Sequence, residues 1–404
     1  MMAAIPRYRP QAGPALLSAG FRPFFLAAAL WASFAVPIWL VLFAGLGQIP
    51  TAFAPLVWHA HELTFGFGAA TVAGFLLTAI PNWTGRLPLQ GGPLVLLVSL
   101  WAIGRVAVLF SASVGAASAA ALDLAFPALF LVVVAREIIA GRNWRNLPAL
   151  AALALLLLGN LLVHLEPLGV VETAALGNRL GVATLLMLIA FIGGRIVPSF
   201  TRNWLAKQRP EAKPPAPFGS ADRVALAVTG LALAVWVSAP ESAVAPWMEI
   251  AAGVALSIRL ARWRGAETFD EPLLWILHAG YGWLSLGFLL LGLDDLLPLL
   301  PRTTALHALT VGAIGTMTLA VMTRASLGHT GRPLTAGAGT TAIYFFVTLA
   351  AVLRLIAPLA GSKYLLTLSL AGTAWSAAFG LFVLLYARPL ALPRVASGDD
   401  ARTI

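Results

Sequence analysis

Cysteine is absent from the 404 residues of this sequence. Its absence excludes disulfide bonds, thiolate metal ligands, iron–sulfur clusters and covalently attached c-type haem. Any metal must therefore be bound by histidine, methionine, carboxylate or backbone oxygen.

Charged residues are also scarce, at 10% of the chain, whereas 60% is hydrophobic. A soluble domain carries about 25% charged residues. The apolar runs are close to 20 residues long, enough to cross about 30 Å of hydrocarbon. No stretch between them is long enough for a soluble domain, so we expect one polytopic membrane domain over residues 1–404.

The spacing of these runs predicts an all-α membrane protein with twelve spans. They lie at 23–46, 56–80, 93–111, 115–139, 147–165, 174–198, 221–238, 242–262, 272–293, 303–325, 335–357 and 364–387. Lys and Arg gather in alternate loops, which the positive-inside rule assigns to the cytoplasm. We therefore expect both termini inside, a retained first span, and a flexible cytoplasmic loop at about 202–220. The net charge of +10 then reflects topology, and nucleic acid is not an expected partner.

An internal repeat links the second and tenth spans. Residues 61–66 (HELTFG) and 307–312 (HALTVG) share His, Leu, Thr and Gly at an offset of 246, and residues 84–86 match 330–332 (TGR) at the same offset. Eight spans separate the matching segments, which favours three pseudo-repeats of four helices and makes spans two, six and ten equivalent. Span six contains no histidine, so two copies carry this hypothesis.

Most of the six histidines fall in one layer of the membrane. An ionisable group inside a membrane helix is costly and is by default a functional hypothesis. At ~1.5 Å of rise per residue, four of them lie in the outer third. These four are His59, His61, His164 and His307, while His278 and His329 lie toward the cytoplasmic side.

His61 and His307 are the expected axial ligands of an outer haem. The two histidines lie at the same depth in the membrane, on two helices that the repeat makes equivalent. On each helix the histidine is followed by small residues at the spacing typical of helix packing. His59 and His61 are two residues apart, so their side chains diverge by about 200° and cannot bind one metal from a regular helix. His59, His164 and His278 are candidates for copper or a second haem. The alternative for His59 is a side chain that reaches the interface beside Trp58 and binds nothing.

Few other charges lie within the spans. Arg105 and Asp123 fall at similar outer depths and could form an ion pair. In the alternative, Arg105 or Arg179 faces the propionates of a haem. Glu62 either relays protons or orients a neighbouring histidine.

Several segments resemble the NnrS family of membrane proteins. They are residues 20–25 (GFRPFF), 58–62 (WHAHE), 81–86 (PNWTGR), 193–198 (GGRIVP), 278–284 (HAGYGWL) and 323–334 (TRASLGHTGRPL). The resemblance implies a bacterial inner-membrane protein that contains haem b and copper and acts in the nitric-oxide response, with nitric oxide as a ligand and a redox partner still to be identified. It does not supply the enzymatic activity, so a nitric-oxide-related oxidoreductase is one possibility and simple binding another.

Two comparisons define the alternatives. The twelve spans and outer histidines are similar to the haem-copper oxidase and nitric oxide reductase fold, but the His-x-His pair stands in span two and span six lacks histidine. A secondary transporter would use Pro81, Pro198 and the Arg105–Asp123 pair at a midplane site. A haem or metal assembly factor for denitrification enzymes would receive its cofactor at His278 and His329.

Overall fold

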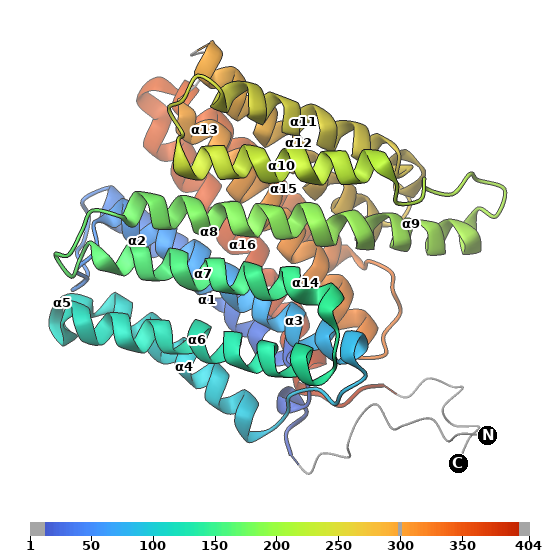
Figure 1. The fold of residues 1–404 in the computed structure, drawn as a ribbon, viewed down its shortest axis with the longest axis horizontal. Helices are drawn as coiled ribbons and strands as arrows, with labels where there is room; N and C mark the ends of the chain where they lie inside the picture. Colours follow the sequence, from blue (N-terminus) through green and yellow to red (C-terminus); the bar gives the residue numbers. More distant parts are fainter. Residues whose placement is uncertain (1–12, 298–300, 396–404) are drawn as a thin grey trace. The chain divides into compact units, whose positions relative to one another are not determined.

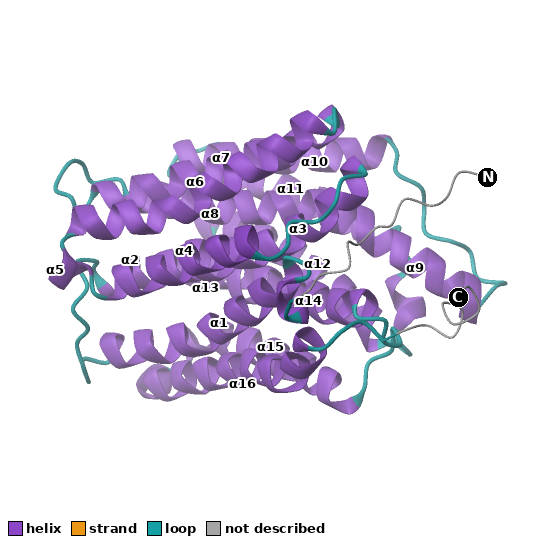
Figure 2. Cartoon of the chain, turned by 90° about the horizontal axis from the view of Figure 1, so that it is seen from below, coloured by secondary structure: helices purple, strands orange, loops and turns teal. Residues whose placement is uncertain are grey.

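The regular secondary structure of the described residues is entirely helical. The computed structural model describes residues 13–297 and 301–395, and no strand occurs among them (Figures 1 and 2). Long apolar runs form helices in lipid because every backbone group must be hydrogen-bonded within its own segment. The predicted all-α class is confirmed.

Eleven helices in the described residues are long and apolar enough to cross a membrane. They are Phe21–Phe43, Pro55–Thr84, Gly92–Leu109, Ala116–Ala140, Trp144–Leu165, Ala174–Gln208, Ser220–Ser238, Pro272–Leu296, Arg302–His329, Ala338–Leu359 and Gly361–Ala391. The span expected at 242–262 corresponds to α11, Ala245–Ala261, which has only 17 residues. At 1.5 Å per residue it is about 25 Å long, short of the hydrocarbon thickness. Twelve spans and the inside location of both termini therefore stay predictions.

The helices divide between two compact units, each described here by itself. Unit 1 comprises residues 1–181, 325–333 and 383–404, and unit 2 comprises residues 182–324 and 334–382. Unit 1 contains α1 (Phe21–Phe43), α2 (Pro55–His61), α3 (Ala69–Thr84), α4 (Gly92–Leu109), α5 (Ser111–Val114), α6 (Ala116–Ala140) and α7 (Leu147–Leu165). Unit 2 contains α9 (Gly194–Gln208), α10 (Ser220–Ser238), α11, α12 (Pro272–Leu296), α13 (Arg302–His307) and α15 (Ala338–Ile356). The helices α8 (Ala174–Leu188), α14 (Thr316–His329) and α16 (Tyr364–Ala391) contribute residues to both units. A single domain over the whole chain stays a prediction.

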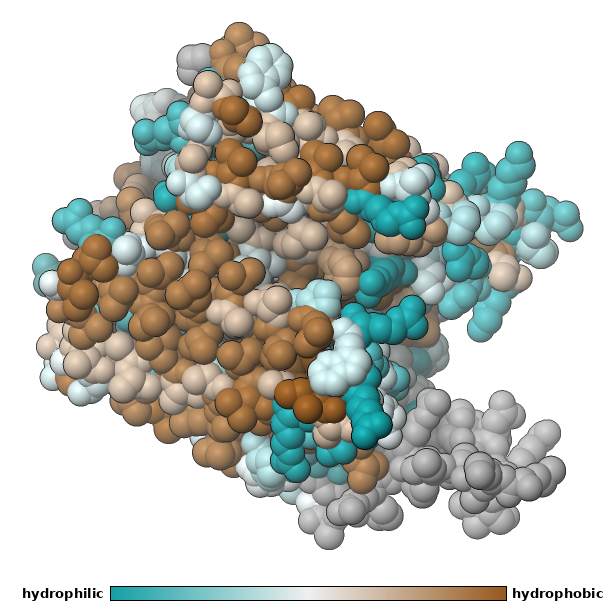
Figure 3. Space-filling view, viewed as in Figure 1, coloured by the Kyte–Doolittle hydropathy of each residue, from teal (hydrophilic) through white to brown (hydrophobic). Residues whose placement is uncertain are grey.

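Unit 1 has an apolar exterior and an interior closed by small residues. The outward faces of α6 and α7 are covered by apolar side chains such as Val132 and Leu158, which are 62% and 45% exposed (Figure 3). Apolar surface of this extent is matched to lipid rather than to water. Inside, a Cβ on Gly74 of α3 would lie 2.6 Å from the ring of Phe25, so glycine allows α1 and α3 to pack closely.

Unit 2 is organised around three neighbouring helices. α10, α11 and α12 lie side by side (Figure 1). Arg259 of α11 is fully buried and donates to Asp222 of α10 at 2.8 Å, to the Tyr281 hydroxyl of α12 at 2.9 Å and to the Ala190 carbonyl at 2.7 Å. The guanidinium is thus compensated by a carboxylate and two further acceptors, as a buried charge requires.

Three long helices contain π-helical segments. These segments are η2 (Glu62–Gly68), η4 (Ile189–Gly193) and η6 (Ala308–Gly315), and they fall in the spans that we expect to be equivalent, the second, sixth and tenth. The first residues of η2 and η6 are 246 apart (308 − 62), the offset of the sequence repeat. π-Helical turns are rare and occur mainly at functional sites. The threefold repeat stays a prediction, with this coincidence in its favour.

Candidate metal centre

His61 occupies the junction between a regular helix and a π-helical segment. It ends α2, and Glu62 begins η2. Adjacent residues on an α-helix point about 100° apart, yet both side chains here are completely buried. Their contact is direct, because Nδ1 of His61 donates to Oε1 of Glu62 at 2.9 Å.

Arg105 of α4 lies between two carboxylates. Its Nη1 donates to Glu62 Oε1 at 2.7 Å, and its Nη2 donates to Oδ1 of Asp123 on α6. The expected ion pair between Arg105 and Asp123 is therefore present. Close approach of the helices depends on glycine: a Cβ on Gly104 would lie 2.9 Å from Asp123 Oδ1, and one on Gly66 would lie 2.8 Å from Arg105 Nη1.

α7 supplies the remaining polar groups from one face. Asn160 and His164 are four residues apart, which places them one above the other on a helix. Nδ2 of Asn160 and Nε2 of His164 both contact Oδ2 of Asp123, at 2.8 and 2.9 Å. Nε2 of His61 lies 2.8 Å from Oδ1 of Asn160 and 3.2 Å from the same Asp123 oxygen.

These contacts leave His61 with an excess of acceptors. Its Nδ1 faces the Glu62 carboxylate, and its Nε2 faces two oxygens, from Asn160 and Asp123. A neutral imidazole has one N–H and therefore satisfies only one of these sides. A positive partner is therefore needed between Nε2 of His61 and these two oxygens, either a proton or a metal ion.

The net charge of the cluster supports the same conclusion. With neutral imidazoles, Glu62 and Asp123 carry two negative charges against one positive charge on Arg105. None of the six polar residues of the cluster is more than 3% exposed; they are His61, Glu62, Arg105, Asp123, Asn160 and His164. An uncompensated buried charge is strongly unfavourable, so one further positive charge stabilises the site.

The donor atoms of His61, Asp123 and His164 are spaced as metal ligands. They lie within 4.8 Å of one another. Metal–ligand bonds to imidazole and carboxylate of about 2.0–2.2 Å bring neighbouring donor atoms to roughly 3–3.5 Å, close to the 2.9 and 3.2 Å observed here. Glu62 would orient His61 from its other nitrogen, the usual arrangement around a metal-binding histidine. Two imidazoles and one carboxylate suit copper, iron and zinc.

Haem does not fit on His61 in this arrangement. Axial ligation would require Nε2 to leave Asn160 and Asp123, and a macrocycle would have to enter a fully buried polar cluster. The rings of Phe53 and Phe65, each 5.4 Å from the His61 ring centre, close the remaining sides. The residues present fit a single metal ion there instead.

His59 and His329 lie outside the cluster within unit 1. His59 is half-buried and stacks on Trp39 with ring centres 4.2 Å apart. Its neighbours differ from those of His61, as the spacing of two residues predicts. His329, at the end of α14, lies 5.3 Å from the ring of Phe21.

His307 and His278 belong to unit 2. Nδ1 of His307, at the end of α13, donates to the Thr303 carbonyl at 2.5 Å. This bond fixes the tautomer with the lone pair on Nε2, which is the usual state of a histidine that binds metal or haem through Nε2. His278 of α12 is 8% exposed, and its Nε2 lies 2.9 Å from the Thr201 hydroxyl. Neither belongs to a cluster of three or more metal-ligand side chains among the described residues.

One member of the cluster, Asn160, was not predicted from the sequence. A neutral amide carries no charge that draws attention inside an apolar span. The available signal was its position one turn before His164 on the same face of α7. Glu62 was expected either to relay protons or to orient a neighbouring histidine, and its contact with His61 fits the second alternative.

Comparison with known proteins gives one finding over almost the full length. The model of the family described as NnrS protein matches residues 15–394. No curated protein matched the chain. Since the family match extends far beyond half of the sequence, the chain belongs to the NnrS family.

Proposed function

We propose that this chain is a metal-dependent protein of the bacterial cytoplasmic membrane that binds nitric oxide in the nitric-oxide response. His61, Asp123 and His164 would hold one transition-metal ion, with copper as the expected metal. Family membership fits the physiological role. The single observation that carries the metal assignment is the convergence of two imidazole Nε2 atoms on one buried carboxylate oxygen.

The surrounding residues have distinct positioning roles in this proposal. Glu62 fixes the orientation of His61, and Arg105 offsets one of the two carboxylate charges. Asn160 holds Oδ2 of Asp123 toward the two histidines. Phe53 lies 5.4 Å from both histidine rings and excludes water. A bound metal would supply a coordination position for a small neutral diatomic molecule and a one-electron redox couple.

Haem b remains part of the proposal, with its place moved away from His61. His307 is the candidate axial ligand because its Nδ1–H is already donated to a backbone carbonyl. His59 and His278 stay candidates of the sequence analysis. Turnover of nitric oxide, transport and cofactor delivery stay alternative functions.

The test is metal analysis and electron paramagnetic resonance on detergent-purified protein. Wild type and His164→Ala are compared with His329→Ala, a control that removes a histidine outside the cluster. We expect about one copper ion per chain in wild type and control, a spectrum that changes when nitric oxide is added, and loss of both in His164→Ala. Equal metal content in all three proteins would refute the assigned ligands. If iron or zinc is found instead and is lost only in His164→Ala, the assigned ligands stand and the metal is not copper.

A further inference from the structure

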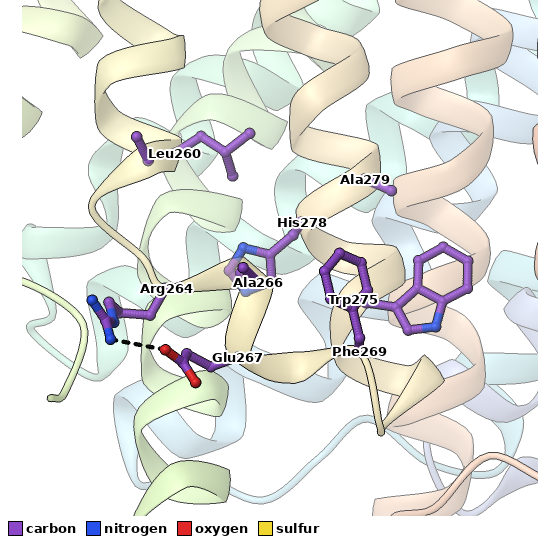
Figure 4. Close-up of a pocket in the computed structure, with 10 residues that line it drawn as sticks. Leu260, Arg264, Ala266, Glu267, Phe269, Trp275, His278 and Ala279 are labelled. Carbon is purple, nitrogen blue, oxygen red and sulfur yellow. Dashed lines mark hydrogen bonds and ion pairs between the residues drawn. The ribbon is translucent and has the colours of Figure 1, made fainter. Parts of the chain in front are cut away.

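A second candidate site lies in unit 2, where α11 ends and α12 begins. A cleft of about 510 Å³ opens between the end of α11, the short helix η5 (Gly265–Thr268) and the first turns of α12 (Figure 4). Ligand pockets of small molecules span about 300–1,000 Å³. The cleft lies at the ends of two apolar helices.

The lining of the cleft is mostly apolar with a few polar groups. Leu260, Phe269 and Trp275 provide apolar and aromatic surface, and Phe269 is 72% exposed at the rim (Figure 4). The polar side chains of the lining are Arg264, Glu267 and His278. An apolar wall with convergent polar groups is the composition of a site for a small lipophilic ring.

Two buried nitrogen atoms of these lining residues lack a hydrogen-bond partner. They are Nδ1 of His278 and Nε of Arg264. His278 is 92% buried, and its other ring nitrogen contacts Thr201, so the imidazole is fixed with Nδ1 unpaired. Leaving a buried polar group unpaired is unfavourable, and a ligand with suitable oxygen atoms removes this cost.

Glycine leaves one of these buried nitrogen atoms without a side chain packed against it from η5. A Cβ on Gly265 would lie 2.7 Å from Nδ1 of His278. Any other residue at this position would cover the nitrogen from the side of η5.

The charges around the cleft balance, which selects a neutral ligand. Arg264 donates to Glu267 at 2.8 Å, and Arg209 donates to the same carboxylate at 3.2 Å and to Asp270. Two positive and two negative charges cancel. A phosphate or carboxylate ligand would lie against Glu267 without a free cation to offset its charge, so the binding of an anion is disfavoured.

We propose that this cleft binds a membrane quinone or its quinol. A quinone is neutral and flat, carries oxygen atoms on its ring edge, and is dissolved in the bilayer. One ring oxygen accepts a hydrogen bond from Nδ1 of His278, while the ring packs against Trp275. The proposal concerns binding in unit 2 and does not require a metal at His61, Asp123 and His164.

The experiment measures tryptophan fluorescence in lipid nanodiscs, because quinones quench nearby indoles. Metal-depleted protein is titrated with decylubiquinone, a short-chain quinone. We expect saturable quenching in wild type, loss of most of its amplitude in Trp275→Phe, and full retention in Trp247→Phe, a control for a 62% exposed tryptophan outside the cleft. His278→Leu should raise the dissociation constant of the quinone about tenfold, which is the effect of losing one buried hydrogen bond.

A second variant tests the same contact in case His278→Leu fails to fold. Gly265→Ala places a methyl group against Nδ1 and should weaken binding by a similar factor while every polar side chain remains. Quenching that rises linearly with quinone, or saturates equally in all variants, overturns the proposal. The proposal is also overturned if the fluorescence of Trp275 changes on addition of phosphatidylglycerol but not of quinone. That result would assign the cleft to a lipid head group. Because metal is absent from the assay, its outcome is separate from that of the metal centre.

Discussion

Asp123→Asn separates the metal-binding role of the cluster from its structural role. The substitution keeps the shape of the side chain and removes its charge. Oδ2 of Asp123 contacts Asn160 at 2.8 Å, His164 at 2.9 Å and His61 at 3.2 Å, so it is the one oxygen that joins both histidines. An amide in its place is a poor metal ligand and leaves the cluster without its surplus negative charge.

The expected magnitudes differ for metal affinity and for stability. Loss of a supporting residue lowers metal affinity about 10–100-fold, and loss of a ligand should exceed the upper figure. Breaking a buried ion pair by removing one partner costs about 3–5 kcal/mol. Arg105 keeps its 2.7 Å bond to Glu62, so we expect a smaller destabilisation of about 1–3 kcal/mol.

The assay pairs chelator competition with thermal unfolding, and Asp222→Asn is the matched control. Asp222 is a buried carboxylate that accepts from Arg259 at 2.8 Å and Arg262 at 3.1 Å, without a histidine beside it. The control should lose comparable stability and keep its metal. Metal retention in Asp123→Asn, or equal metal loss in Asp222→Asn, would refute the reasoning.

Two further predictions follow from packing and from an unpaired carboxyl. Gly66→Ala should destabilise the protein by about 1–3 kcal/mol, because its Cβ would lie 2.8 Å from Arg105 Nη1. Gly230→Ala should stabilise it by about 0.5–1 kcal/mol, because the added Cβ would meet no neighbouring group within 4 Å. Thermal unfolding compares the two variants. Glu249 is completely buried, and neither of its carboxyl oxygens has a hydrogen-bond partner, so the carboxyl should be neutral and react with dicyclohexylcarbodiimide. Mass spectrometry should find the adduct on Glu249 and none on Glu62, whose carboxylate is paired; labelling of Glu62 alone would contradict this.

The parts of the fold predicted from sequence are those that lipid dictates. Long apolar runs have one low-energy structure in a bilayer, so eleven of the expected spans appear as helices in the described residues. The remaining expected span also appears as a helix, α11, but its 17 residues begin later than the apolar run indicates. The Arg105–Asp123 pair was foreseeable because charges buried in lipid must be paired.

The geometry of the site was less accessible because it depends on local departures from the α-helix. The sequence reading used a regular helical period, and η2 begins directly after His61. The His61–His307 hypothesis required Nε2 of His61 to face a haem, whereas it faces Asn160 and Asp123. Depth along a helix can be counted from sequence, but the direction of a side chain beside a π-helical turn cannot.

The most direct test of the metal centre is X-ray absorption at the edge of the metal that purifies with the protein. We predict a first shell of nitrogen and oxygen at about 2.0–2.2 Å with the outer-shell scattering of two imidazoles in wild type, and loss of the metal edge in His164→Ala. A shell of four porphyrin nitrogens, or a spectrum unchanged by His164→Ala, would contradict a metal ion held by His61, Asp123 and His164.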